Sequence, residues 1–257
     1  MKRMLASLAL LCLAPLSACA RSEPLLDVQV VDLDQGSTLS RIPYAGRDYI
    51  QGQPGHRFSV SLQNLTGERV LAVLSVDGVN AISGQTASAS QAGYVLEPWQ
   101  QVEIRGWRKS YSDIAEFYFT DLPDSYAART GRPDNVGVVG VAAFRERRPE
   151  PIAYQRPAPM IGAMEKSAAD NAAGASVRRA KSSAPSATAQ QIGTGHGQRR
   201  YDPVAQTQFE RESLRPDQRV ALFYDSFDAL VARGVIRNRV YDNQPEPFPI
   251  GFAPDPQ

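Results

Sequence analysis

Cysteine is nearly absent from this sequence: its 257 residues include two, Cys12 and Cys19, both within the first twenty positions. The chain after Cys19 therefore has no thiol for a disulfide bond, a thiolate metal site or a cysteine nucleophile. We expect the domain that it forms to be stabilised by the burial of apolar side chains alone.

Histidine and net charge are also scarce, and both limit the possible functions. The chain has two histidines, His56 and His196, so a zinc site would have to take carboxylates as its other ligands. We therefore expect no metal and no other cofactor. A Ser-His-Asp arrangement remains open because Ser and Asp are plentiful, but no G-x-S-x-G elbow exists, and we assign no catalytic residue. The formal net charge of +1 gives no reason to expect a nucleic-acid partner.

The N-terminal stretch predicts export. Lys2 and Arg3 precede an apolar region, residues 5–16, that is too short to cross a bilayer as a helix. The next residues, Leu-Ser-Ala-Cys19, resemble the bacterial lipobox, in which the cysteine is lipidated and becomes the mature N-terminus. We favour lipidation of Cys19, and the alternative is ordinary cleavage after Ala20.

The predicted location follows from this leader. Three acyl chains would hold the protein securely to a membrane, and Ala20 after the cysteine resembles outer-membrane sorting in a diderm bacterium. We expect a cell-envelope protein that is anchored in the outer membrane and faces the periplasm, with a soluble periplasmic protein as the alternative. Its expected partners are an envelope protein or glycan, and the membrane itself through the anchor; the sequence leaves the oligomeric state open.

Residues 49–147 contain short apolar runs separated by Gly, Asn, Asp and Pro about every 8–12 residues, which is typical of a β-sandwich or barrel. Two of the runs, residues 69–77 and 135–144, are apolar on both faces and predict central strands. The fold that we expect is mainly β, an antiparallel β-sandwich with a jelly roll as one option.

The alternating run at residues 58–62 predicts a specific hairpin with the apolar run that follows. The intervening Asn64–Gly67 segment suits a short turn with Gly67 at positive φ. The predicted register places six apolar residues on one face in three opposed pairs: Leu62 with Val70, Val60 with Ala72, and Phe58 with Leu74.

A second strand pair is predicted between residues 101–107 and 115–120. Side-chain parity places four apolar residues on its inner face: Val102, Ile104, Phe117 and Phe119. The same register pairs Arg105 with Glu116 and points Trp107 toward solvent.

An outward tryptophan with tyrosine neighbours would form an aromatic platform that stacks on sugars or anchors a partner protein. The competing interpretation is that a second layer of the protein covers Trp107. The candidate ligand-binding residues are Trp107, Tyr111, Tyr118, Trp99 and Arg105.

Composition divides the whole chain into five segments. Between the β-rich block and the C-terminal part, Pro, Ala, Ser and Gly dominate and large apolar side chains are rare, which predicts disorder. Beyond it, a strand and a helix capped by Ser226 or Asp225 and ended by Gly234 should pack on the core. The expected segments are the export signal (1–20), the β-sandwich core (21–148), the disordered linker (149–200), the C-terminal strand and helix (201–240) and a frayed Pro-rich tail (241–257).

The segment Gly193-Thr-Gly-His-Gly197 lacks the lysine and following helix of a phosphate-binding loop, so we expect His196 to be a loop residue docked on the domain. With the Val-Leu-Ser-Val-Asp-Gly78 run, this motif resembles uncharacterised exported proteins of Gram-negative bacteria. That resemblance implies a compartment but no function.

Three functions compete at this point. The leading hypothesis is a non-catalytic envelope lipoprotein that binds or scaffolds another component. The second is a carbohydrate- or peptidoglycan-binding module that uses the aromatic residues above. The third is a periplasmic hydrolase, which requires His56 or His196 within hydrogen-bond reach of a carboxylate.

Overall fold

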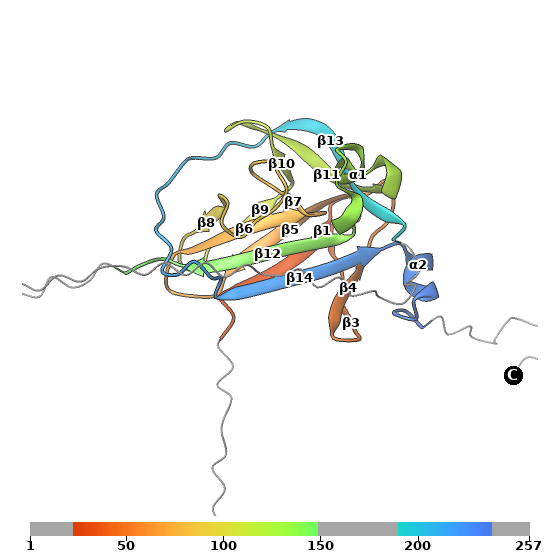
Figure 1. Cartoon of the computed structure of the whole chain (residues 1–257), viewed down its shortest axis with the longest axis horizontal. Coiled ribbons are helices and arrows are strands. Elements are labelled where there is room, and N and C mark those ends of the chain that lie inside the picture. Colours follow the sequence, from red (N-terminus) through yellow and green to blue (C-terminus); the bar gives the residue numbers. More distant parts are fainter. Residues whose placement is uncertain (1–22, 149–189, 238–257) are drawn as a thin grey trace, which may run out of the picture.

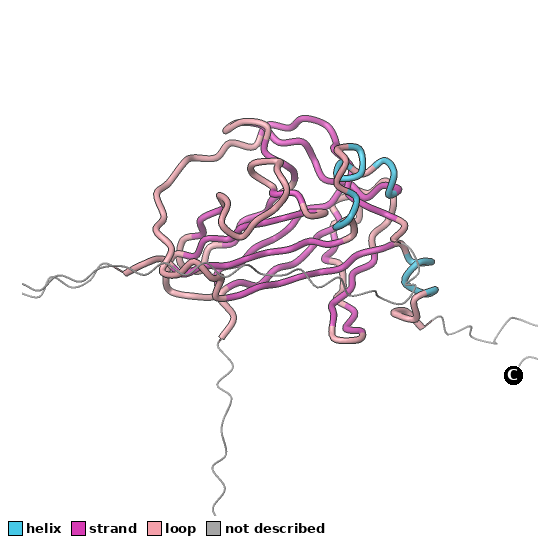
Figure 2. Tube along the Cα trace, in the orientation of Figure 1, coloured by secondary structure: helices cyan, strands magenta, loops and turns pink. Residues whose placement is uncertain are grey.

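The computed structural model describes residues 23–148 and 190–237. These residues form two β-sheets that pack together, and the helices lie toward one end (Figures 1 and 2). The β-sandwich prediction is therefore confirmed. The predicted leader with Cys19, residues 149–189 of the predicted linker and the Pro-rich tail lie outside the described residues.

Within the described residues, each sheet has seven strands. Sheet A contains β1 (Leu26–Asp32), β2 (Ser37–Thr38), β5 (Arg57–Asn64), β9 (Gln101–Ile104), β10 (Gly106–Arg108), β11 (Asp113–Asp121) and β13 (Ile192–Tyr201). Sheet B contains β3 (Ile42–Tyr44), β4 (Arg47–Gln51), β6 (Val70–Val76), β7 (Val79–Asn80), β8 (Tyr94–Leu96), β12 (Val138–Arg145) and β14 (Gln218–Asp225).

Sheet B runs in the order β3-β4-β14-β12-β6-β7. The two apolar runs, β6 and β12, lie inside this sheet, as their double-sided hydrophobicity predicts. The C-terminal strand β14 is inserted between β4 and β12, so it is an integral part of the sheet. Its pairing with β4 is parallel, which departs from the wholly antiparallel sandwich that we expected.

The predicted hairpin between residues 58–62 and 70–74 is wrong. β5 belongs to sheet A and β6 to sheet B, so the chain between them crosses from one sheet to the other. The buried side chain of Asn64 supports this crossing, because it donates to the Glu68 carbonyl at 2.7 Å and accepts from the Thr66 amide at 2.9 Å. The six apolar residues are nevertheless all buried, since they face each other across the core.

The predicted register between residues 101–107 and 115–120 is also wrong. β9 pairs with β5, and β10 pairs with β11 in a register that sets Gly106, not Arg105, opposite Glu116. Gly106 lies so close to β11 that a Cβ there would be 2.1 Å from the Ala115 carbonyl oxygen. Arg105 instead pairs with Glu103 at 2.8 Å.

The break between β9 and β10 reverses the orientation of Trp107. Ile104 and Trp107 are both buried although they are three residues apart, because the alternation is interrupted between them. The Trp107 side chain is 2 % exposed, and its ring packs edge-on against Phe117 at a centroid distance of 4.7 Å. The prediction of an outward Trp107 is therefore wrong.

The disorder prediction is wrong for residues 190–200. These residues include most of β13, which pairs with β11 in an antiparallel ladder from Asp113 to Asp121 (Figure 1). The strand has few large apolar residues, and backbone hydrogen bonds and buried polar contacts hold it in place.

Asp77 connects four parts of the fold. Asp77 and Gly78 form the tight turn between β6 and β7, with φ values of 54° and 71°. The buried Asp77 carboxylate accepts hydrogen bonds from the Gly137 amide at 2.9 Å, the Thr194 amide at 2.7 Å and the Tyr224 hydroxyl at 2.5 Å. It thereby joins the start of β12 with β13 and β14.

The short helices are η1 (Leu122–Asp124), α1 (Tyr126–Arg129), η2 (Pro133–Asn135) and α2 (Phe227–Ala232). The N-cap of α1 is Ser125, and the N-cap of α2 is Ser226, one of the two residues expected there. On α2, Leu230 is buried, whereas Phe227 is 42 % exposed. None of the helices in the described part of the chain is long and apolar enough to span a membrane.

Candidate functional site

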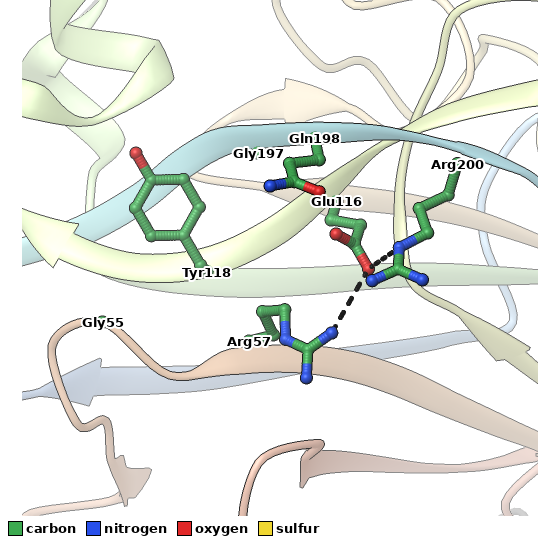
Figure 3. Close-up of a pocket in the computed structure, with 7 residues that line it drawn as sticks. All are labelled: Gly55, Arg57, Glu116, Tyr118, Gly197, Gln198 and Arg200. Atoms are coloured by element: carbon green, nitrogen blue, oxygen red, sulfur yellow. Dashed lines mark ion pairs between the residues drawn. The ribbon is translucent and has the colours of Figure 1, made fainter.

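The outer face of sheet A carries two depressions that share Arg57, Glu116 and Arg200, with volumes of about 350 and about 240 Å³. We call them together the Glu116 groove. The larger one is lined by Gly55, Arg57, Glu116, Tyr118, Gly197, Gln198 and Arg200 (Figure 3). The smaller one adds Leu33, Arg105, Ile114, Tyr201 and Asp202.

Glu116 lies at the centre of the groove between two arginines. The Arg200 Nε lies 2.8 Å from its Oε1 and an Arg57 Nη lies 3.9 Å away, as the dashed lines in Figure 3 show. The Glu116 side chain is 8 % exposed, whereas the arginine side chains are 53 % and 41 % exposed. The carboxylate is therefore covered and paired, while the two guanidinium groups remain within reach of a ligand.

Asp34 fixes the position of Arg57. Its Oδ1 accepts from the Arg57 Nη2 at 2.5 Å and Nε at 3.1 Å, and its Oδ2 accepts from the Arg57 amide at 2.6 Å. These hydrogen bonds lower the pKa of Asp34 and raise the pKa of Arg57. Arg57 is thus held as a cation between two carboxylates, with its side chain ordered before any ligand binds.

The glycines of the Gly193–Gly197 motif make room for the groove. A Cβ on Gly195 would lie 2.1 Å from the Cζ of Tyr118, so the Tyr118 ring rests directly on the β13 backbone. A Cβ on Gly197 would lie 2.9 Å from the Glu116 carbonyl oxygen and 3.2 Å from its Cβ. The motif is part of a strand that packs closely against two groove residues, and it is not a loop.

The structure separates the aromatic residues that the sequence grouped together. Tyr118 lines the larger depression and Arg105 the smaller one. Tyr111, in the turn after β10, and Trp99, between β8 and β9, are 67 % and 64 % exposed but do not line either depression. Trp107 is buried, so the predicted single platform does not form.

One histidine meets the geometric requirement of the hydrolase hypothesis. The Nδ1 of His56 lies 2.8 Å from the Oδ2 of the buried Asp32. Asp32 also accepts from the amides of Asp34 and Gln35, both at 2.9 Å, so it supports the turn after β1 as well. The residues that line the two depressions include no Ser, Thr or Cys that could serve as a nucleophile.

His196 has no carboxylate partner of this kind in the described part of the chain. It lies in β13, not in a loop as expected, with its ring nearly parallel to Trp107 at a centroid distance of 6.3 Å. Partial burial, followed by the nearby charge of Lys109, lowers its pKa.

No metal-binding cluster is found either: among the described residues, no group of three or more His, Cys, Asp and Glu side chains could hold a metal ion. Comparisons with protein-family models, with curated proteins and with solved structures found no match.

Proposed function

We propose that this protein is a non-catalytic binding module of the bacterial cell envelope, exported and held at a membrane through lipidated Cys19. The observation that carries the proposal is the Glu116 groove, in which two partly exposed arginines flank a covered carboxylate beside an aromatic ring. Its side chains come from three paired strands, β5, β11 and β13, so a ligand would meet a largely ordered surface.

A carbohydrate or peptidoglycan ligand is favoured by the position of Tyr118. A tyrosine ring can pack against the apolar face of a sugar, and guanidinium groups bind carboxylates through paired charge-assisted hydrogen bonds. Tyr118 and Arg200 both line the larger depression. An envelope glycan that carries carboxylate groups, as peptidoglycan does on its peptide stems, would engage both.

The test is a binding titration of the Cys19→Ser protein with soluble peptidoglycan fragments, followed by calorimetry. Tyr118→Ala and Arg200→Ala should each weaken binding about tenfold, the loss expected when about 1.4 kcal/mol is removed. Arg215→Ala is the matched control, because Arg215 is exposed and outside the groove. Binding that is insensitive to both groove variants would contradict the assignment of this site.

If no fragment binds, crosslinking of the tagged protein in its native envelope tests for a protein partner. A partner that is captured by the normal chain but lost in the Arg200→Ala chain would support a scaffolding role. The anchor is tested separately: Cys19→Ser should release the protein from membranes, and continued fractionation with membranes would count against lipidation.

A further inference from the structure

A second surface, on the outer face of sheet B, carries a row of aromatic side chains. Phe223 of β14 lies beside Tyr49 of β4 at a centroid distance of 5.7 Å, and Tyr49 lies beside Tyr44 of β3 at 6.4 Å. The guanidinium carbon of Arg47 lies 4.8 Å from the centre of the Phe223 ring. We call these four residues the aromatic row.

The side chains of the aromatic row are accessible, because the alternation of side chains along the strand directs them to the outer face of the sheet. Leu222 and Tyr224 point into the core, so Phe223 between them points outward. Tyr44 is 41 % exposed, and Tyr49 and Phe223 are partly exposed. The neighbouring rings are inclined by 67° and 39°. Rings inclined in this way present both edges and faces to a ligand, and the rings and apolar side chains of a peptide can pack against either.

The chain itself supplies a peptide near this position. After α2 it turns back toward the aromatic row: a Cβ on Gly234 would lie 3.5 Å from the Tyr44 hydroxyl. The described part of the chain ends at residue 237, three residues after this contact, and twenty residues follow it. Paired strands lie about 5 Å apart, and a proline-rich chain can extend about 3 Å per residue. The twenty residues that follow residue 237 are thus long enough to cross β3, β4 and β14.

The composition of this tail matches the surface. Residues 245–256 contain five prolines together with Phe248 and Phe252. Proline-rich segments bind grooves lined by aromatic side chains, because their extended backbone loses little entropy on binding.

Charge favours the same pairing. Residues 245–256 contain two carboxylates, Glu246 and Asp255, and no Lys or Arg, whereas Arg47 and Arg219 are exposed on the outer face of sheet B. Arg219 lies on the same face as Phe223, four residues along β14.

We propose that the aromatic row is a binding surface for a proline-rich polypeptide, and that the chain's own residues 245–256 occupy it. This proposal concerns a different face from the Glu116 groove and does not depend on it. Intramolecular attachment raises the effective concentration of the tail to about the millimolar range, so even weak contacts would keep it bound.

The absence of cysteine after Cys19 allows a direct test in the whole chain. In a background that carries both Cys12→Ser and Cys19→Ser and so has no native thiol, Ala221→Cys places a thiol on the outer face of β14, next to Phe223 but outside the aromatic row. Ala253→Cys places the second thiol in the tail. The matched control pairs Ala253→Cys with Ala205→Cys, an exposed position after β13 in sheet A.

Disulfide formation under mild oxidation should be at least tenfold faster for the 221–253 pair than for the 205–253 pair. Adding Tyr49→Ala, or replacing Pro247 and Pro249 by Ala, should remove this preference, whereas Tyr201→Ala, an exposed tyrosine elsewhere, should leave it unchanged. Circular dichroism of each variant checks that the sheets are intact.

Equal rates for the two pairs would overturn the proposal. So would a preference that survives Tyr49→Ala in a folded variant. A fast reaction that joins two chains instead of one would show that the surface holds the tail of a second copy, and would overturn docking within the chain.

Discussion

Replacing Asp77 by Asn is expected to remove a distinct pH dependence of folding stability. Burial raises the pKa of Asp77 from 3.8 to about 6. One pKa unit corresponds to about 1.4 kcal/mol, so ionisation of Asp77 costs about 3 kcal/mol more in the folded protein than in the unfolded chain. The hydrogen bonds from Tyr224, Thr194 and Gly137 already offset part of the burial cost.

Proton binding in the folded and unfolded states determines whether stability rises or falls with pH. Between pH 4 and pH 6 the folded protein holds a proton on Asp77 that the unfolded chain has released, so stability falls as the pH rises through this range and levels off above it. Asn does not titrate, keeps the shape of the side chain and tolerates the φ of 54° at this position. The introduced amide group would face donor groups, however, so the variant should be less stable than the normal chain at pH 4.

Urea unfolding of both chains at pH 4, 5, 6 and 7 measures the effect. The stability difference between the two chains should shrink by about 2–3 kcal/mol from pH 4 to pH 7. Other carboxylates contribute equally to both chains and cancel in this difference. A difference that stays constant over the range would refute the argument that Asp77 carries a raised pKa.

Three further substitutions test other contacts. Gly195→Ala should displace the Tyr118 ring and cost about 1–3 kcal/mol, and calorimetry with peptidoglycan fragments should show weaker binding in the groove. Trp107→Ala should cost about 3–5 kcal/mol in urea unfolding, because it leaves a cavity beside Phe117; a cost below about 1 kcal/mol would mean that the ring is not buried. Ser226→Ala should cost about 1 kcal/mol by removing the N-cap of α2, and an unchanged melting temperature would contradict this role.

Local features of the sequence predicted much of the secondary structure. The double-sided apolar runs placed β6 and β12 inside a sheet, and Ser226 marked the start of a helix. Each of these depends on residues that are close together in the sequence. The pairing of the strands, in contrast, depends on residues that are far apart in the sequence. The prediction of pairing failed at the crossing after Asn64.

That failure has a simple physical cause. A period of two identifies which side chains face the core, but it is the same whether two strands pair edge to edge or face each other across the core. Phe58 and Leu74 satisfy both arrangements. Arg105 lies outside both strands, between β9 and β10; the alternation is interrupted there and Trp107 turns inward, which propensity and periodicity cannot detect.

The candidate site was hidden for a related reason. Arg57, Glu116 and Arg200 are far apart in the sequence, and each alone resembles an ordinary charged surface residue. The feature of the sequence that could have indicated this site is the spacing of the glycines at every second position. In a strand, Gly193, Gly195 and Gly197 must share one face, and such a face admits the side chains of a neighbouring strand against the backbone. Low hydrophobicity made the segment resemble a linker, yet the same small residues are what allow Tyr118 and Glu116 to pack there.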